Sequence, residues 1–244
     1  MKSAKNITGF FFALWALFTF IVTFLVFFLP AMITWLIPEP RGQDIFIRIS
    51  RLWMNIWLNI TGCPLTVKGK ENFKSGKTYI VIFNHNSLMD VPISCPYVPG
   101  PNKTIAKSSF AKIPLFGFYY KKGSVLVNRK SEESRRQSYE KMKKVLNNGM
   151  HMCIYPEGTR NRTDEPLKPF HDGAFRLAVD SKHAIIPALI FNTKKVLPTG
   201  KFFYFRPSKI EMHFLPEINA ASDAGELKRQ CFETMKAYYE LHKP

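Results

Sequence analysis

A histidine and an aspartate five positions apart are the residues of this sequence best suited to chemistry. His85 and Asp90 lie in the segment NHNSLMD, residues 84–90, which directly follows an apolar run. On one regular helix they would not face each other, because five residues turn the chain by about 500°. If a helix begins at a cap provided by Asn86 or Ser87, the aspartate lies in its first turn and the loop folds the histidine back onto it. The aspartate would then fix the imidazole tautomer and leave the other nitrogen free to deprotonate a hydroxyl.

A polar turn follows a second apolar run. It reads YPEGTR, residues 155–160, and its Pro156 and Gly158 favour a tight turn that exposes Glu157 and Arg160. The planar guanidinium of an arginine matches two oxygens of a phosphate. On its own, this segment fits a polar surface turn equally well, just as the first fits a helix-capping motif with an incidental histidine.

Two further cations, Lys107 and Arg129, each stand at the end of a candidate strand. Arg129 ends the segment GSVLVNR, residues 123–129, and the lysine ends residues 102–107. Either alone would be an ordinary solvated side chain. In parallel α/β sheets, however, ligands collect outside the carboxyl ends of the strands. The strand-end motifs together therefore predict a base and a basic pocket at one edge of a sheet.

The elements that position these groups alternate between strands and helices. A helix is expected to begin at the cap Ser131 and to end before Gly149. The alternation predicts an α/β domain with a central, mostly parallel or mixed sheet flanked by helices. Strands are expected at residues 65–68, 78–83, 102–107, 124–127, 151–155, 184–191 and 209–215, helices at 131–148, 173–182 and 223–242, and helix or loop at 108–120.

Patterns of several other enzyme classes are missing. No serine lies in a G-x-S-x-G segment, and neither a P-loop nor a dinucleotide-binding signature occurs. The four cysteines form no CxxC pair, which disfavours a disulfide framework and a structural zinc site. Direct transfer to an acceptor hydroxyl activated by His85 therefore fits better than a covalent intermediate on the protein.

Taken in order, the segments resemble the motifs of the glycerolipid acyltransferase family. NHNSLMD resembles the N-H-x-x-x-x-D motif, and YPEGTR resembles a motif usually written FPEGTR. GSVLVNR resembles a motif that often has Phe at position 126 and Asp at 128, and residues 186–188 resemble an apolar-Pro-apolar strand. The length and the apolar N-terminus match the 1-acylglycerol-3-phosphate acyltransferases. One departure is FHDG at 170–173, where many members carry Lys before the Gly.

The resemblance implies transfer of a fatty acyl group from acyl-CoA or acyl-carrier protein to the sn-2 hydroxyl of 1-acylglycerol 3-phosphate, which gives phosphatidic acid. It implies no metal and no cofactor. Another lysolipid acceptor, such as a lyso-amino-acid lipid, and a catalytically inactive lipid-binding protein are the alternatives. The implied roles are base for His85, orienting group for Asp90, phosphate ligands for Lys107, Arg129 and Arg160, and lining of the acceptor pocket for Glu157, Gly158 and Thr159.

The first 62 residues predict a membrane-anchoring motif of two helices. Residues 7–37 contain no charged residue, and Ile7 to Leu29 alone is long enough to cross a bilayer before Pro30 kinks or ends the helix. Positive residues on both flanks leave a full span and a re-entrant hairpin open. Residues 44–59 read as an amphipathic helix whose two Trp suit the headgroup region. The alternative for this second segment is a helix buried on its own catalytic domain.

Residues 63–244 are expected to form the α/β acyltransferase domain. Its 30 basic and 16 acidic residues leave it a net charge of +14, within +17 for the whole chain. Such a domain beside an anchor is expected at the anionic, cytoplasmic face of the cell membrane. Charge alone would also permit nucleic-acid binding, but no recognition module occurs, so membrane lipids are the predicted partner.

Overall fold

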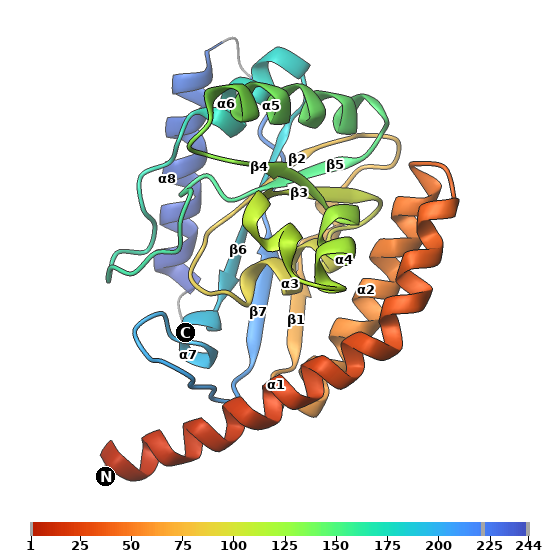
Figure 1. Cartoon of the computed structure of the whole chain (residues 1–244). Coiled ribbons are helices and arrows are strands. Elements are labelled where there is room, and N and C mark those ends of the chain that lie inside the picture. The colour runs from red at the N-terminus through yellow and green to blue at the C-terminus, as the bar shows by residue number, and fades with distance from the viewer. Residues whose placement is uncertain (1, 221–222, 243–244) are drawn as a thin grey trace.

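A seven-stranded mixed sheet forms the centre of the computed structural model, which describes residues 2–220 and 223–242 (Figure 1). The strand order is β1-β7-β6-β2-β5-β3-β4. From β6 to β4 neighbouring strands are parallel, whereas β7 is antiparallel to β6, and β1 is parallel to β7. The predicted fold class is therefore confirmed. The strands are β1 (Leu65–Lys68), β2 (Ile80–Phe83), β3 (Asn102–Lys107), β4 (Ser124–Val127), β5 (His151–Ile154), β6 (Ile185–Phe191) and β7 (Ile210–Phe214).

Helices cover both faces of the sheet. The cluster on one face includes Val81 and Phe83 of β2 with residues of α1, α2 and α3, and the cluster on the other face includes Ile80 and Ile82 with residues of α5, α6 and α8. This alternation follows from the two-residue period of a strand. The helices are α1 (Lys2–Ile33), α2 (Arg41–Ile60), α3 (Asp90–Ser94), α4 (Phe116–Lys122), α5 (Glu132–Asn147), α6 (Gly173–Ser181), α7 (Thr193–Val196) and α8 (Ala224–His242).

The carboxyl ends of the five mutually parallel strands lie at one edge of the sheet. This edge, which we call the catalytic edge, receives the loops that follow β2, β3, β4, β5 and β6. The cap predicted for α5 is present, since the Ser131 hydroxyl accepts the Ser134 N–H at 3.2 Å. The short α7 at the end of β6 was not expected from the sequence.

Helix α1 is bound to the rest of the chain along one face only. It does not end at Pro30 but continues to Ile33, and a 3-10 turn follows at Thr34–Leu36. Residues 7–36 are long and apolar enough to cross a membrane. Large apolar side chains on the outer face are exposed, and the buried apolar positions are Ala13, Ala16, Phe24 and Ala31.

The expectation that the two Trp of α2 face lipid headgroups is wrong. Trp53 and Trp57 are 2% and 6% exposed. Their indole N–H groups donate to the Thr23 hydroxyl at 2.9 Å and to the Ala16 carbonyl at 3.1 Å, both on α1. An amphipathic pattern shows which face is apolar without showing what covers it, and here α1 and the α/β domain cover it. The alternative, a helix packed on its own domain, is the arrangement observed.

An arginine on α2 reinforces this packing. The guanidinium of Arg51 donates to the carbonyls of Pro96 and Val98 at 2.6 and 3.1 Å. Leu52 and Ile56 of the same helix are exposed. Helix α2 therefore joins α1 to the domain and leaves only part of its apolar surface free.

Candidate active site

His85 and Asp90 meet at the catalytic edge. The carboxylate oxygen Oδ2 of Asp90 lies 2.8 Å from Nδ1 of His85. A carboxylate oxygen accepts hydrogen bonds, so Nδ1 carries a proton, and in the neutral ring Nε2 has the lone pair. The imidazole is 18% exposed, whereas the aspartate is fully buried. The structure thus produces the contact predicted from the spacing, with one ring nitrogen available as a base.

Backbone groups hold the aspartate in this position. Its Oδ2 also accepts the N–H groups of Asn86 and Ser87 at 2.6 and 2.7 Å. Neither of these residues caps α3 as expected; Met89 occupies the N-cap position, and Asp90 is the first helical residue. The side chain of Asp90 therefore closes the turn backwards onto residues 86 and 87. One oxygen receives all three donors, and Oδ1 is buried without a hydrogen-bond partner among the described residues.

Glu157 holds the backbone on either side of the site together. Its Oε1 accepts the His85 N–H at 2.7 Å and its Oε2 accepts the Lys168 N–H at 3.1 Å. The carboxyl is 1% exposed. Burial raises the pKa of Glu157 to about 7, although the two backbone hydrogen bonds oppose the shift. The side chain points into the protein, where these two bonds give it a positioning role, and its lining of the acceptor pocket stays a prediction.

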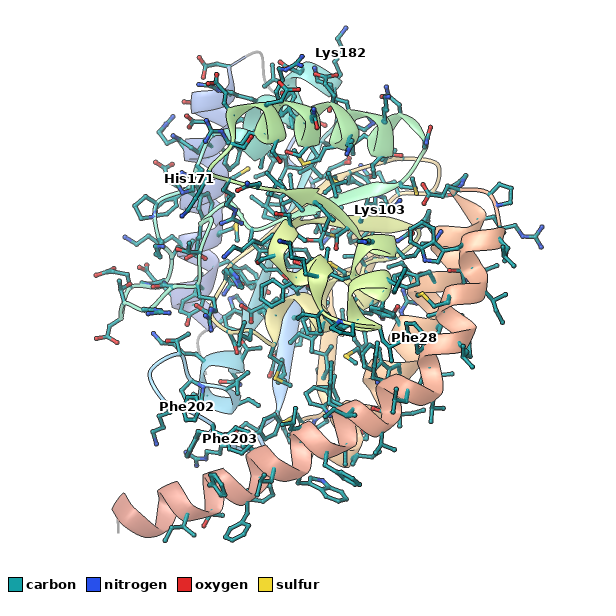
Figure 2. All side chains as sticks on the ribbon, in the orientation of Figure 1. Phe28, Lys103, His171, Lys182, Phe202 and Phe203 are labelled. Carbon is teal, nitrogen blue, oxygen red and sulfur yellow. The ribbon has the colours of Figure 1, made fainter. Side chains whose placement is uncertain are left out.

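Arg129 and Gly158 connect the ends of β4 and β5. The Arg129 guanidinium donates to the Gly158 carbonyl. Gly158 has φ +70°, and a Cβ at this position would lie 2.7 and 2.9 Å from ring atoms of His171. Only glycine adopts this backbone conformation without strain, and here the space is also filled. His171 lies on the segment between β5 and α6 (Figure 2).

The remaining predicted residues, Lys107, Thr159 and Arg160, lie at the outer border of the site, which we call the rim. Lys107 is exposed at the end of β3 and pairs in register with Val127, two residues before Arg129. Thr159 is exposed, and its hydroxyl accepts from Nζ of Lys168 at 2.6 Å. Arg160 is half-buried, and no hydrogen bond or ion pair joins its guanidinium to another residue in the described part of the chain. Its donors are therefore free for a ligand.

Four residues that support the His85–Asp90 pair were not predicted. The Tyr155 ring lies 4.7 Å from the imidazole of His85, and its hydroxyl bonds to Ser94. Asn161 donates its backbone N–H to the His85 carbonyl at 2.6 Å. The Asn84 side chain, next to His85, donates to the Ile190 carbonyl at 3.0 Å and accepts the Ile190 N–H at 2.7 Å, and the Lys168 N–H binds Glu157 as described above. Asn84 and Tyr155 stand inside the two motifs, but nothing in the sequence distinguishes Asn161 or Lys168 from ordinary loop residues.

The site consists of an oriented imidazole base and two arginines whose guanidinium donors are wholly or partly unused. It lies on an α/β sheet that carries an apolar N-terminal helical hairpin. Within residues 2–220 and 223–242, no group of three or more His, Cys, Asp or Glu could hold a metal ion. The feature these side chains define is an enzyme site with an oriented base that can deprotonate a hydroxyl. The acyltransferase family profile matches residues 64–191, more than half of the chain, and the chain belongs to this family. The family predicted from the motifs is confirmed.

Individual relatives give the same result. The chain is 28% identical over 190 residues to a 1-acyl-sn-glycerol-3-phosphate acyltransferase of Chlamydomonas reinhardtii, covering 75% of this chain and 57% of that protein. It is 29% identical to the Saccharomyces cerevisiae enzyme of that name, covering 77% and 65%. The chain thus spans about three fifths of these relatives. The crystal structure of the 1-acyl-sn-glycerophosphate acyltransferase PlsC of Thermotoga maritima has the same fold, with a TM-score of 0.79, 23% identity, and coverage of 98% and 97%.

Proposed function

We propose that the protein transfers a fatty acyl group from acyl-CoA or acyl-carrier protein to the sn-2 hydroxyl of 1-acylglycerol 3-phosphate, giving phosphatidic acid in phospholipid synthesis. The observation that carries the proposal is the 2.8 Å contact between His85 and Asp90 at the catalytic edge. The names of the two relatives above support this choice of acceptor.

In the proposed reaction each transfer step involves a named atom. Nε2 of His85 takes the proton of the acceptor hydroxyl, whose oxygen forms a bond to the thioester carbonyl carbon. The tetrahedral intermediate then breaks its carbon–sulfur bond, and the departing thiolate takes the proton back from Nε2. Asp90 stabilises the imidazolium formed in between. The reaction needs no cofactor in this scheme, because the thioester already supplies an activated acyl group.

The acceptor's phosphate is assigned to the arginines on the rim. Arg160 has an unpaired guanidinium, and Arg129 retains donors beyond the one used at Gly158. A guanidinium binds two phosphate oxygens with a geometry that a lysine ammonium does not reproduce. Lys107, at the end of the neighbouring strand, adds positive charge to this rim.

Membrane attachment is proposed to be one-sided. Near its beginning, the Gly9 carbonyl of α1 accepts the Phe205 N–H at 3.0 Å, and further along Phe24 packs on Phe116 and Tyr119 of α4. A helix bound to the domain at both places cannot cross a bilayer without drawing polar surface into hydrocarbon. We therefore propose that residues 1–62 lie in one leaflet, at the cytoplasmic face where thioester donors are found, with the exposed face of α1 in the lipid.

The test is an acyl-transfer assay of the full chain with a panel of acceptors and labelled acyl-CoA or acyl-carrier protein. Fastest turnover with 1-acylglycerol 3-phosphate, lost in His85→Ala, is the expected result. Faster turnover of a lysolipid without a phosphomonoester would replace the proposed acceptor. Binding of lysolipid without turnover of any acceptor would leave only a lipid-binding protein.

A further inference from the structure

The segment between β3 and β4, residues 108–123, exposes an apolar surface that the transfer reaction does not use. Phe110, Ile113, Leu115 and Phe118 are 40%, 44%, 46% and 59% exposed. Four large apolar side chains within nine positions are unusual on a water-exposed segment, since scattered single residues are the rule. We call this stretch the α4 segment.

The inner side of the α4 segment is firmly packed, so its outer residues are displayed on a rigid element. The Tyr119 ring lies 4.8 Å from that of Phe46, and its hydroxyl donates to Ser50 at 2.6 Å. At Gly117, a Cβ would collide with the Ala111 carbonyl, which shows how closely the two turns of the segment approach. The exposed residues are therefore a fixed feature of the surface and not the product of a loose loop.

The element that carries this surface packs directly on α1, whose outer face is assigned to the lipid. The Phe24 ring of α1 lies 6.0 Å from Phe116 of the α4 segment. Ile21 and Leu25, within three positions of Phe24, are 49% and 52% exposed. Figure 2 shows Phe28 on the stretch of α1 beside α4. The two elements that carry these exposed apolar side chains are thus neighbours in the fold.

Charge identifies the occupant of this surface. Lys112 and Lys121 are exposed along the segment, and the described structure pairs neither of them with a carboxylate. Nζ of Lys121 lies 5.5 Å from the Phe118 ring centre. Lysines whose ammonium groups rise from an apolar surface suit the boundary between acyl chains and anionic headgroups. A protein partner would need a matching acidic, apolar surface, for which the molecule offers no evidence.

We propose that the α4 segment is a second bilayer contact, in which Phe110, Ile113, Leu115 and Phe118 enter the headgroup–acyl boundary of an anionic membrane. The proposal rests on the one-sided attachment inferred above and adds a contact separate from residues 1–62. Because the segment directly follows β3 at the catalytic edge, this contact would hold the mouth of the His85 site at the depth of a lysolipid's glycerol hydroxyl.

An environment-sensitive probe on the full chain tests the proposal. All four native cysteines are buried, so a maleimide dye labels an introduced surface cysteine selectively. Three single variants are compared: Phe118→Cys in the α4 segment, Phe18→Cys on the outer face of α1, and Leu241→Cys at the exposed end of α8. Vesicles of phosphatidylcholine with phosphatidylglycerol are added, and dye emission and quenching by spin-labelled lipid are recorded.

We expect blue-shifted, quenchable emission at positions 18 and 118 and unchanged emission at 241. A shift at 18 without one at 118 would overturn the second contact and leave the attachment by α1 intact. No shift at either position would overturn the attachment itself, whatever the outcome of the acyl-transfer assay.

A paired substitution gives an independent measurement. Ile113→Ser with Phe118→Ser should weaken partitioning into the same vesicles about tenfold or more, given the transfer free energy of two large apolar side chains. Leu241→Ser is the matched control and should have no effect. Turnover of micellar acceptor by the double variant should stay close to wild type, which shows that the fold is intact. Unchanged partitioning with normal micellar turnover would contradict the proposal.

Discussion

The carboxylate of Glu157 binds the backbone of His85: Oε1 accepts the His85 N–H at 2.7 Å, across the boundary between β5 and β2. The ring of His85 is oriented by Asp90 and its backbone by Glu157, so the base is held at two points. The segment YPEGTR therefore holds the segment NHNSLMD in place through the side chain of Glu157.

The raised pKa of Glu157 predicts a pH-dependent contribution to stability. Burial raises this pKa from 4.5 to about 7, so between these values the folded protein binds more protons than the unfolded chain. The contribution is present below pH 4.5 and is lost as the pH rises to about 7, by about 3 kcal/mol in total. Denaturant unfolding of wild type and Glu157→Gln across this range should show the difference, because the glutamine does not titrate. Parallel pH profiles for the two proteins would contradict the shifted pKa.

The His85–Asp90 pair predicts a large loss of turnover when either residue is replaced. His85→Ala removes the base and should lower kcat by about 100-fold or more. Asp90→Asn should lower kcat by a similar factor with little change in KM, since it weakens control of the tautomer and not acceptor binding. Circular dichroism and thermal unfolding establish that the fold persists. His242→Ala, at the end of α8, is the control histidine, and near-normal kcat in His85→Ala would refute the assignment of the base.

A glycine substitution separates backbone strain from crowding at the site. Gly158→Ala should destabilise the protein by more than Gly76→Ala, because both residues have positive φ but a Cβ has no neighbour within 4 Å at position 76. The backbone cost alone is about 1–2 kcal/mol. Adding His171→Ala removes the ring that the new Cβ would meet, so the double variant should approach the control. Equal unfolding free energies for the two single variants would show that His171 yields without cost.

Replacement by lysine should have different effects at Arg160, whose guanidinium is unpaired, and at Arg129, which already donates to Gly158. Arg160→Lys keeps the charge and loses the fork, so we expect KM for a phosphomonoester acceptor to rise several-fold with kcat less affected. Arg129→Lys also removes the donor to the Gly158 carbonyl, and should lower thermal stability as well. Steady-state kinetics at constant ionic strength measure the change in KM, and thermal unfolding measures the loss of stability in Arg129→Lys. Wild-type KM in Arg160→Lys would exclude it as a phosphate ligand.

The parts of the site that could be predicted from the sequence are contacts between residues close together in the chain. The five-residue interval between His85 and Asp90 and the strand ends before them follow from local pattern. The bond from Glu157 to His85 joins residues 72 positions apart, and the Lys168 N–H reaches the same carboxyl from a loop without a periodic pattern. Trp53 shows a further limit: its apolar face was evident, but the partner that buries it was not. Long-range packing decides such cases.

A buried histidine remote from the catalytic edge provides the last prediction. His151 begins β5, is 7% exposed, and accepts the Tyr79 N–H at Nδ1 at 3.0 Å, so it is neutral in the folded protein. Burial lowers its pKa from 6.5 to about 4. Between these values the unfolded chain binds more protons, so stability is full above pH 6.5 and falls by about 3 kcal/mol as the pH drops towards 4. This slope is opposite in sign to that of Glu157. His151→Asn retains an acceptor for Tyr79 and does not titrate, so its unfolding free energy should approach or exceed that of wild type at about pH 4.5 and be lower at neutral pH. A constant difference between the two proteins over this range would show that His151 is protonated equally in the folded and unfolded states.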